Sequence, residues 1–468
     1  MKISLREVLL ATFGTTSFTG KVEFTGVTTD SRSVKPGDLF VALKGDKFDG
    51  HAFVAKAAAS GAAGVMVSQA VEAPKGVAVI RVEDTLRAYQ DLARSYRIGI
   101  KDLIVVAVTG SNGKTSTKDM IAACLSTKFK VVKTQANFNN EIGLPKTLLS
   151  LEEDTQVAVV EIGMRALGQI KAMCAIASPQ IAVITNVGDT HIGELGSIEN
   201  IAQAKSEILE DLPRENGFAV LNGDQQLVRD MVTKLHTKAS WFGLGVQNDY
   251  RGDDVLVDAD GTEFTCIEKV TGDFASFKLQ QIGEHNVMNA LAAIAVGRHL
   301  GVKLNDMVKA LADYETTGKR QEILHFGTYT VINDAYNASP ASMEAALKTL
   351  HELKKHVPGG HGRSLAVLAD MLELGEISAD AHRKVGEIAV REKTDIVLTY
   401  GTEAVFISEE IARLGGKTKT YICIDKEDAA INLKRMLKEN DVILLKGSHS
   451  MQVDDLVGLV FKEHLGTK

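Results

Sequence analysis

The chain has 468 residues, of which 45% are hydrophobic and 24% are charged, and its formal net charge is -7 at pH 7. This length exceeds what one hydrophobic core organises, so we expect about two to four domains. The negative charge gives no general attraction to nucleic acid or to an anionic membrane, so we expect no nucleic-acid partner.

The four cysteines, Cys124, Cys174, Cys266 and Cys423, are far apart and lie in apolar stretches without a CxxC pair. This pattern favours buried, reduced thiols over a zinc site or a disulfide framework. The N-terminal stretch lacks the length of a secretory signal. No window approaches the ~18 uninterrupted apolar residues of a membrane span. We therefore expect a cytoplasmic protein without membrane insertion.

Three blocks follow one another along the chain. The first, residues 1–100, mixes short strand-like runs such as "AGVMVS" with helical stretches. Within it, residues 83–97 place Leu86, Tyr89, Leu92 and Tyr96 at helical spacing. We expect a small mixed α/β domain here.

The second block, residues 101–317, contains the runs "LIVVAVTG", "QVAVVEIG", "QIAVITNVG" and "GFAVLNGD", separated by helical segments. Continuous β-branched runs are typical of strands that are buried on both faces of a parallel sheet. An Ala-rich helix ending before Gly301 follows. The block is predicted to be a domain with a mainly parallel sheet.

The third block, residues 318–468, alternates strands and helices from "TYTVINDAY" to "DVILLKGS". This rhythm predicts a Rossmann-like, doubly wound domain. The stretch "HVPGGHGRS", residues 356–364, is predicted to be a surface loop within it.

The most informative segment is "VAVTGSNGKTSTKDM", residues 105–119. An apolar run ends in a glycine turn, and a helix is expected to follow with its unpaired N–H groups facing the turn. Lys114 can reach the β and γ oxygens of a nucleotide, Thr115 can bind Mg²⁺, and Ser116 can add a phosphate contact. We expect nucleotide contacts from Gly110, Ser111, Asn112, Gly113, Lys114, Thr115 and Ser116.

This loop departs from the usual G-x-x-x-x-G-K-[ST] pattern, because Val108 occupies the place of the first glycine. A phosphate loop alone does not separate a kinase, a transporter ATPase, a GTPase and a ligase. Residues at the ends of the next strands discriminate among them, because ligands gather at the carboxyl ends of parallel strands. Glu161 ends one such run and His191 follows another. Both are candidate magnesium ligands, the carboxylate being the kind of hard oxygen donor that Mg²⁺ prefers.

At this point the sequence resembles the Mur ligases. The resemblance is carried by "TGSNGKTS", "EIGM", "TNVGDTHIG", "AKSEI", "GEHNVMNALAA" and "GKRQEI", in the family's order, and it covers nearly the whole chain. It implies an α/β fold of three domains: a UDP-binding N-terminal domain, a P-loop ATPase centre and a Rossmann-like C-terminal domain.

Further stretches resemble the family member that acts last in the series. They are "TQANFNNEIGLPKTLLS", "NDAYNASPASM", "LADMLELGEISADAHRKVG" and "LLKGSHSMQVDDLV". The stretch "TTDSRSVKPGDLFVALKG", followed by "FDGH", resembles the UDP-sugar-binding domain that the later Mur ligases share. Two small departures are "LADM" in place of LGDM and "AYNASP" in place of AYNANP. The resemblance implies UDP-N-acetylmuramoyl-tripeptide and D-alanyl-D-alanine as substrates, ATP and Mg²⁺ as cofactors, an acyl-phosphate mechanism, and products ADP, phosphate and UDP-muramoyl-pentapeptide in peptidoglycan synthesis. We also expect a monomer.

The resemblance also assigns roles to single residues. It implies that Lys114, Glu161, His191, Lys205 and Arg320 are catalytic, with Lys205 a lysine that becomes carbamylated and helps to hold a second Mg²⁺. It also implies that Arg320 reaches the γ-phosphate when the C-terminal domain closes. The other implied contacts are Asn286 and Asn289 with adenine, Asp334 with ribose, Ser31 and Arg32 with the UDP moiety, and Asn139 and Asn140 with the sugar-peptide. "ADMLELG" and "KGSHSM" are expected to bind the dipeptide.

Three other functions remain open at this point. A neighbouring Mur-type ligase would add a different amino acid, although no DNPR-type motif is present. A folylpolyglutamate synthetase would not need the N-terminal domain. A P-loop regulatory ATPase would need neither that domain nor "HNVMN" followed by "GKRQEI".

Overall fold

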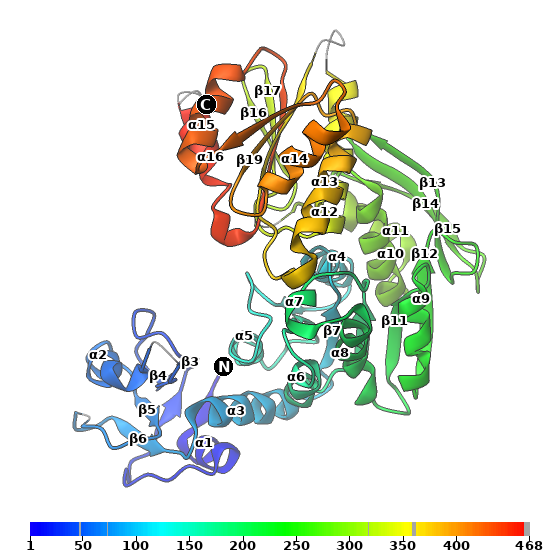
Figure 1. Cartoon of the computed structure of the whole chain (residues 1–468). Coiled ribbons are helices and arrows are strands. Elements are labelled where there is room, and N and C mark those ends of the chain that lie inside the picture. The colour runs from blue at the N-terminus through cyan, green and yellow to red at the C-terminus, as the bar shows by residue number, and fades with distance from the viewer. Residues whose placement is uncertain (46–47, 73, 317, 358–361, 463–468) are drawn as a thin grey trace.

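The computed structural model describes residues 1–45, 48–72, 74–316, 318–357 and 362–462. Three α/β domains follow one another (Figure 1), with the N-terminal domain set apart from the other two at one end of helix α3 (Thr85–Gly99). The predicted boundary after residue 317 falls on a residue outside the described part, as do residues 358–361 of the predicted loop. The boundaries at 100 and 317 stay predictions.

The N-terminal domain is built on a parallel sheet of order β3-β4-β5-β6, beside a short antiparallel pair, β1-β2. Its elements are β1 (Ile3–Ser4), α1 (Leu5–Thr12), β2 (Glu23–Phe24), β3 (Gly26–Thr28), β4 (Asp38–Val41), η1 (Gly50–Phe53), α2 (Val54–Ala59), β5 (Gly64–Val67) and β6 (Ala78–Arg81). The expected helix at 83–97 is confirmed as α3, whose N-cap Asp84 accepts from the N–H of Arg87. Because α3 also packs on α5 and α6 of the next domain, it joins the two.

The middle domain holds a sheet of order β15-β14-β13-β12-β11-β10-β7-β9-β8. Its strands are β7 (Ile104–Thr109), β8 (Val131–Lys133), β9 (Val157–Glu161), β10 (Ile181–Ile184), β11 (Phe218–Asn222), β12 (Lys238–Gly243), β13 (Tyr250–Asp258), β14 (Gly261–Glu268) and β15 (Phe274–Leu279). The helices are α4 (Lys114–Ser126), α5 (Gly143–Leu148), α6 (Gln169–Ala177), α7 (Ile192–Leu195), α8 (Ile198–Glu210), α9 (Gln226–Asp230), η2 (Met231–Lys234), α10 (Glu284–His299) and α11 (Leu304–Ala312).

Strands β7, β9 and β10 are neighbours, pair in parallel and are buried almost throughout. This confirms the prediction from their β-branched runs. Their shared register sets Val108 beside Glu161 and Thr109 beside Ile184. The phosphate loop, Glu161 and the loop after β10 therefore meet at one edge of the sheet, where parallel α/β sheets bind ligands.

The C-terminal domain has the sheet order β16-β17-β21-β18-β19-β20, parallel except for β16-β17. Its strands are β16 (Glu322–Phe326), β17 (Tyr329–Asn333), β18 (Ser364–Ala369), β19 (Ile396–Tyr400), β20 (Lys419–Cys423) and β21 (Val442–Lys446). The helices are α12 (Pro340–Lys355), η4 (Gly375–Ile377), α13 (Ser378–Arg391), α14 (Val405–Leu414), α15 (Lys426–Met436), η5 (His449–Met451) and α16 (Asp455–Phe461). The predicted alternation of strands and helices is confirmed.

All four cysteines are buried and unpaired, as expected. None of the helices in the described part of the chain combines the length and the apolar character that crossing a bilayer requires.

Candidate active site

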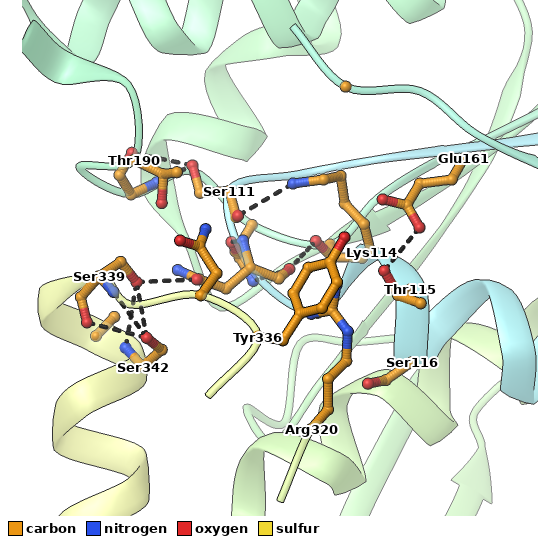
Figure 2. A pocket seen from close by; sticks show the side chains of 18 of the residues that line it. Ser111, Lys114, Thr115, Ser116, Glu161, Thr190, Arg320, Tyr336, Ser339 and Ser342 are labelled. Carbon is orange, nitrogen blue, oxygen red and sulfur yellow. Dashed lines mark hydrogen bonds between the residues drawn. The ribbon is translucent and has the colours of Figure 1, made fainter. Parts of the chain in front are cut away.

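A cavity of about 1270 Å³ lies where the middle and C-terminal domains meet. Its middle-domain wall includes the phosphate loop, Glu161 and His191, and its C-terminal wall includes Arg320, Asp334 and segments of the third domain. Figure 2 shows side chains from both domains pointing into the same space. Groups from two separate domains can therefore act on one bound molecule.

Two glycines let the phosphate loop fold tightly. Gly110 has a φ of 154° and Gly113 a φ of 77°, and Gly113 is the N-cap of α4. A Cβ atom on Gly110 would collide with the hydroxyl of Thr185, and one on Gly113 with the side-chain oxygen of Asn289. Both positions therefore require glycine, for backbone conformation and for space.

The loop after β10 forms hydrogen bonds that hold the phosphate loop in its conformation. The N–H of Asn112 donates to Oδ1 of Asn186 at 2.8 Å, and Nδ2 of Asn186 donates to the Asn112 carbonyl at 3.0 Å. The hydroxyl of Ser111 donates to the Gly188 carbonyl at 2.9 Å. Asn186 lies in "TNVGDTHIG", a stretch that carries the family resemblance, but no role was predicted for it. Its amide holds the loop in shape before any ligand binds.

Lys114 begins α4, and its amine donates to the carbonyls of Gly110 at 2.7 Å and Ser111 at 3.2 Å (Figure 2). Burial lowers the pKa of this amine, the charge of Glu161 opposes that effect, and Arg320 adds to it. The amine is held by carbonyl groups that a phosphate oxygen could replace, and its contact with the β- and γ-phosphates stays a prediction.

Glu161 and Thr115 form the hard-oxygen site that Mg²⁺ would need. The Thr115 hydroxyl donates to Oε2 of Glu161 at 2.7 Å, and Nδ2 of Asn139 donates to Oε1 at 2.8 Å. Glu161 is only 2% exposed, and no cationic side chain in the described residues lies within ion-pair distance of its carboxylate. A buried carboxylate held only by neutral donors fits a cation beside the phosphate loop.

His191 has a left-handed backbone, with a φ of 68°, and precedes α7. Its Nδ1 lies 2.6 Å from Oε2 of Glu373 in the C-terminal domain and 3.6 Å from Oε2 of Glu194. Burial lowers the pKa of the imidazole, Glu373 acts in the opposite direction, and Lys114 and Lys205 lower the pKa further. His191 therefore has the carboxylates of Glu194 and Glu373 beside it, and the Lys114 amine is near enough to affect its pKa.

Lys205 lies on α8 and is 2% exposed. Burial, and then the charge of Lys114, lower the pKa of its amine well below the ordinary value. Among the residues that the structure describes, no carboxylate lies within ion-pair distance of this amine. A buried lysine without a counter-ion favours the neutral form, which is the form that can react with CO₂.

Asn286 and Asn289 are buried on the first turns of α10, on the face predicted from their spacing. Oδ1 of Asn289 accepts from the Thr117 hydroxyl at 3.0 Å, and Nδ2 of Asn286 donates to the Ile282 carbonyl at 3.2 Å. Both side chains line the cavity beside the phosphate loop. Their contact with adenine stays a prediction.

In the C-terminal wall, the guanidinium of Arg320 lies 3.7 Å from the ring centre of Tyr336 (Figure 2). This is stacking distance for a cation–π contact. Asp334 pairs with the buried Lys446, whose amine lies 2.6 Å from Oδ2, and accepts from the N–H of Gln321 at 3.2 Å. Asp334 lines the cavity, but its carboxylate is already engaged, so its predicted contact with ribose stays untested.

The remaining predicted residues separate into two places. Asn139 and Asn140 line the cavity, and Asn140 accepts from the N–H of Gly143 at 2.9 Å. Ser31 and Arg32 lie in the N-terminal domain, and neither is part of the cavity lining in the described residues. The guanidinium of Arg32 is paired with Asp30 at 2.8 Å.

Two residues of the C-terminal domain make contacts with the middle domain that were not predicted from the sequence. Ser339, the N-cap of α12, donates from its hydroxyl to Oδ1 of Asn112 at 3.0 Å (Figure 2). Glu373 reaches both His191 and Arg165, the latter at 3.3 Å. The only sequence signal was that Ser339 and Glu373 lie in stretches already quoted for their resemblance.

Comparison with known families and proteins agrees with this geometry. Three family descriptions match in order: "Mur ligase family, catalytic domain" at residues 23–97, "Mur ligase middle domain" at 108–297, and "Mur ligase, glutamate ligase domain" at 319–449. The UDP-N-acetylmuramoyl-tripeptide–D-alanyl-D-alanine ligase of Bacillus subtilis is 42% identical over 436 residues, which are 92% of each chain.

Solved structures give the same result. A crystal structure of MurF from Acinetobacter baumannii superposes with a TM-score of 0.89 at 30% identity, over 99% of each chain. The MurF ligase of Thermotoga maritima in complex with ADP superposes with a TM-score of 0.81 at 28% identity, over 94% of this chain and 98% of that one. With its three α/β domains and its phosphate loop, this chain belongs to the Mur ligase family.

Proposed function

We propose that this protein is an ATP-dependent ligase that joins D-alanyl-D-alanine to UDP-N-acetylmuramoyl-tripeptide and so makes UDP-muramoyl-pentapeptide. The observation that carries the proposal is the shared cavity, in which the phosphate loop faces the "LADMLELG" and "KGSHSM" segments of the C-terminal domain. Relatives that carry this activity in their names align with 92% of the chain. A neighbouring Mur-type ligase would have the same phosphate loop, but its most similar relatives would be named for a different activity.

The proposed reaction has two steps. A terminal carboxylate oxygen of the tripeptide attacks the γ-phosphorus of ATP, the bond to the bridging oxygen breaks, and ADP leaves. The amine of D-alanyl-D-alanine then attacks the acyl carbon and loses a proton, and phosphate leaves with the former carboxylate oxygen. The protein accelerates both steps by aligning the reactants and by neutralising charge as it develops.

In this proposal Lys114 and the N–H groups of the phosphate loop hold the β- and γ-phosphates. Thr115 and Glu161 hold one Mg²⁺, which fits the neutral donors around that buried carboxylate. Bound Mg²⁺ would neutralise phosphate charge. Arg320, held against Tyr336, faces the phosphate region from the other domain. His191 helps to hold a second Mg²⁺.

Lys205 is proposed to carry a carbamate, which would add an anionic oxygen ligand near His191. The depressed pKa of its amine and the lack of a paired carboxylate in the described residues support this assignment. Two further parts of the proposal concern binding. Asn286 and Asn289 would contact the adenine ring, and Asp334 would contact the ribose. The sugar-peptide part of the substrate would lie against Asn139 and Asn140.

The N-terminal domain would bind the UDP moiety through Ser31 and Arg32, away from the site of chemistry. We propose that the enzyme works in the cytoplasm, where its nucleotide substrates occur, and that it works as a monomer.

One assay tests the proposed function. Purified protein is incubated with ATP, Mg²⁺ and UDP-muramoyl-tripeptide, and phosphate release is followed after adding D-alanyl-D-alanine or single amino acids. Release that depends on the dipeptide supports the proposal. Release with a single amino acid indicates a neighbouring ligase, and release without any acceptor indicates a regulatory ATPase.

A further inference from the structure

The turn formed by residues 371–376 of the C-terminal domain rests directly on α7 of the middle domain. The N–H of Gly193 donates to the Glu373 carbonyl at 3.1 Å, so the two backbones are in contact. In Figure 1, α7 lies at the end of the middle domain that faces the C-terminal domain. The contact lies beside the cavity, since His191 and Glu373 both line it.

Two glycines make this close approach feasible. A Cβ atom on Gly193 would lie 2.7 Å from the Gly375 nitrogen and 3.0 Å from the Glu373 carbonyl oxygen. A Cβ atom on Gly375 would lie 2.7 Å from the Cα of Gly193. These are backbone atoms on both sides, so a side chain at either glycine must push the domains apart.

The side chain of Glu373 adds an electrostatic contact to the backbone one. Its Oε2 lies 2.6 Å from Nδ1 of His191, and its Oε1 lies 3.3 Å from a guanidinium nitrogen of Arg165. The ring nitrogen is within ion-pair distance, although its N–H is not aimed at the carboxylate. Arg165 and the Lys114 amine attract the Glu373 carboxylate to this place, and the nearby carboxylate of Glu194 opposes them.

A histidine that serves a metal site usually needs a second group to orient its ring, and a carboxylate is the common partner. Here the partner belongs to a different domain. We propose that Glu373 is a positioning residue, which orients the imidazole of His191 only when the C-terminal domain is docked on α7. The C-terminal domain would then dock on α7 and orient the His191 imidazole for catalysis in the same step. This inference rests on the proposed function for the metal role of His191 and for its kinetic readout.

Two variants separate the side chain from the backbone contact. Glu373→Gln removes the charge, and its matched control is Glu376→Gln, an exposed carboxylate in the same turn. Gly193→Ala places a methyl group between the backbones without introducing a left-handed residue. Its control is Gly458→Ala in α16, where a Cβ atom meets nothing within 4 Å.

The first readout is domain docking, measured by small-angle X-ray scattering with ADP and Mg²⁺. We expect a larger radius of gyration for Gly193→Ala and Glu373→Gln, with both controls like the parent protein and all melting temperatures similar. The second readout is kinetic. We expect kcat to fall about tenfold in both variants, because an imidazole that is not held in place serves the metal site less well.

A parental radius of gyration and parental kcat for Glu373→Gln would overturn the proposal, even if Gly193→Ala were impaired.

The third readout is equilibrium binding of Mn²⁺ in the presence of ADP. Unchanged stoichiometry supports positioning. Loss of one bound Mn²⁺ with docking retained would overturn it, because Glu373 would then be a metal ligand together with His191 and Glu194, whose donor atoms lie within 4.8 Å of one another.

Discussion

The hydroxyl of Ser339 donates a hydrogen bond to Oδ1 of Asn112 at 3.0 Å, although the two residues are 227 positions apart in the sequence. Ser339 also accepts from the N–H of Ser342 and so caps α12. Asn112 is part of the phosphate loop, which Asn186 holds from the other side. One serine thus joins the start of a C-terminal helix to the nucleotide site of the middle domain.

Replacing Ser339 by alanine should affect both stability and catalysis. Loss of the cap should lower the free energy of unfolding by about 1 kcal/mol. Loss of the hydrogen bond to Asn112, worth about 1 kcal/mol, should lower kcat/KM for ATP about fivefold. Asp425→Ala is the matched control, because Asp425 caps α15 in the same domain and is not part of the cavity wall. Equal kinetics for the two variants would show that the bridge has no role in catalysis.

Lys114→Ala should lower kcat at least about 100-fold, because it removes a preorganised positive charge from the γ-phosphate, a loss that typically costs about 3 kcal/mol of barrier. Phosphate release and the melting temperature are measured together. Lys128→Ala is the control, since that lysine follows α4 and donates to the Leu300 and Gly301 carbonyls away from the loop. Parental turnover by Lys114→Ala would contradict the assigned role of the loop.

Lys205→Ala should be inactive and should recover part of its turnover when short-chain carboxylates are added, because a carboxylate can replace the missing carbamate in the cavity left by the side chain. Lys114→Ala should not recover under the same conditions. Turnover is measured against carboxylate concentration. Failure of every carboxylate to restore activity, in a folded Lys205→Ala protein, would count against the carbamate.

The stability of the C-terminal domain should depend on pH through His382. This histidine is fully buried, its Nε2 accepts from the N–H of Met371 at 3.0 Å, and its Nδ1 lies 2.8 Å from the Ser378 carbonyl. Burial lowers the pKa of the imidazole, and the Ser378 carbonyl, Asp370 and Glu403 oppose the shift only in part. The neutral ring is therefore the form that supports the turn after β18.

The direction of the pH effect follows from proton binding. Between the lowered pKa of the folded state and the ordinary value of about 6.5, the unfolded chain binds more protons, so the free energy of unfolding rises with pH in that window. His382→Gln should flatten the pH dependence of denaturant unfolding there, whereas His325→Gln, at an exposed position, should not. Parallel curves for the parent and His382→Gln would contradict this role.

Much of the architecture could be predicted because its signals are local. β7, β9 and β10 are buried on both faces, so their sequences are continuous β-branched runs. The hairpin strands β13 and β15 were not identified, because they face solvent on one side and mix charged with apolar residues. Each pairs in antiparallel fashion with β14, which lies between them, and the three strands extend the sheet beyond its parallel part.

The candidate site likewise contains residues that could be predicted from local sequence signals and contacts that could not. Spacing within one segment indicated Gly110, Lys114 and Thr115, and the ends of adjacent strands indicated Glu161. The contacts of Ser339 with Asn112 could not be foreseen, because they depend on how two independently folded domains dock. The ion pair of Asp334 with Lys446 was also unexpected, since it joins the ends of two strands far apart in sequence.

The central claim is that the peptide carboxylate is phosphorylated before the new amide bond forms. The direct test uses UDP-muramoyl-tripeptide labelled with ¹⁸O in its terminal carboxylate, together with ATP, Mg²⁺ and D-alanyl-D-alanine. The mechanism predicts that inorganic phosphate released during turnover carries one labelled oxygen per molecule. Phosphate without label, alongside normal formation of the pentapeptide product, would contradict the mechanism.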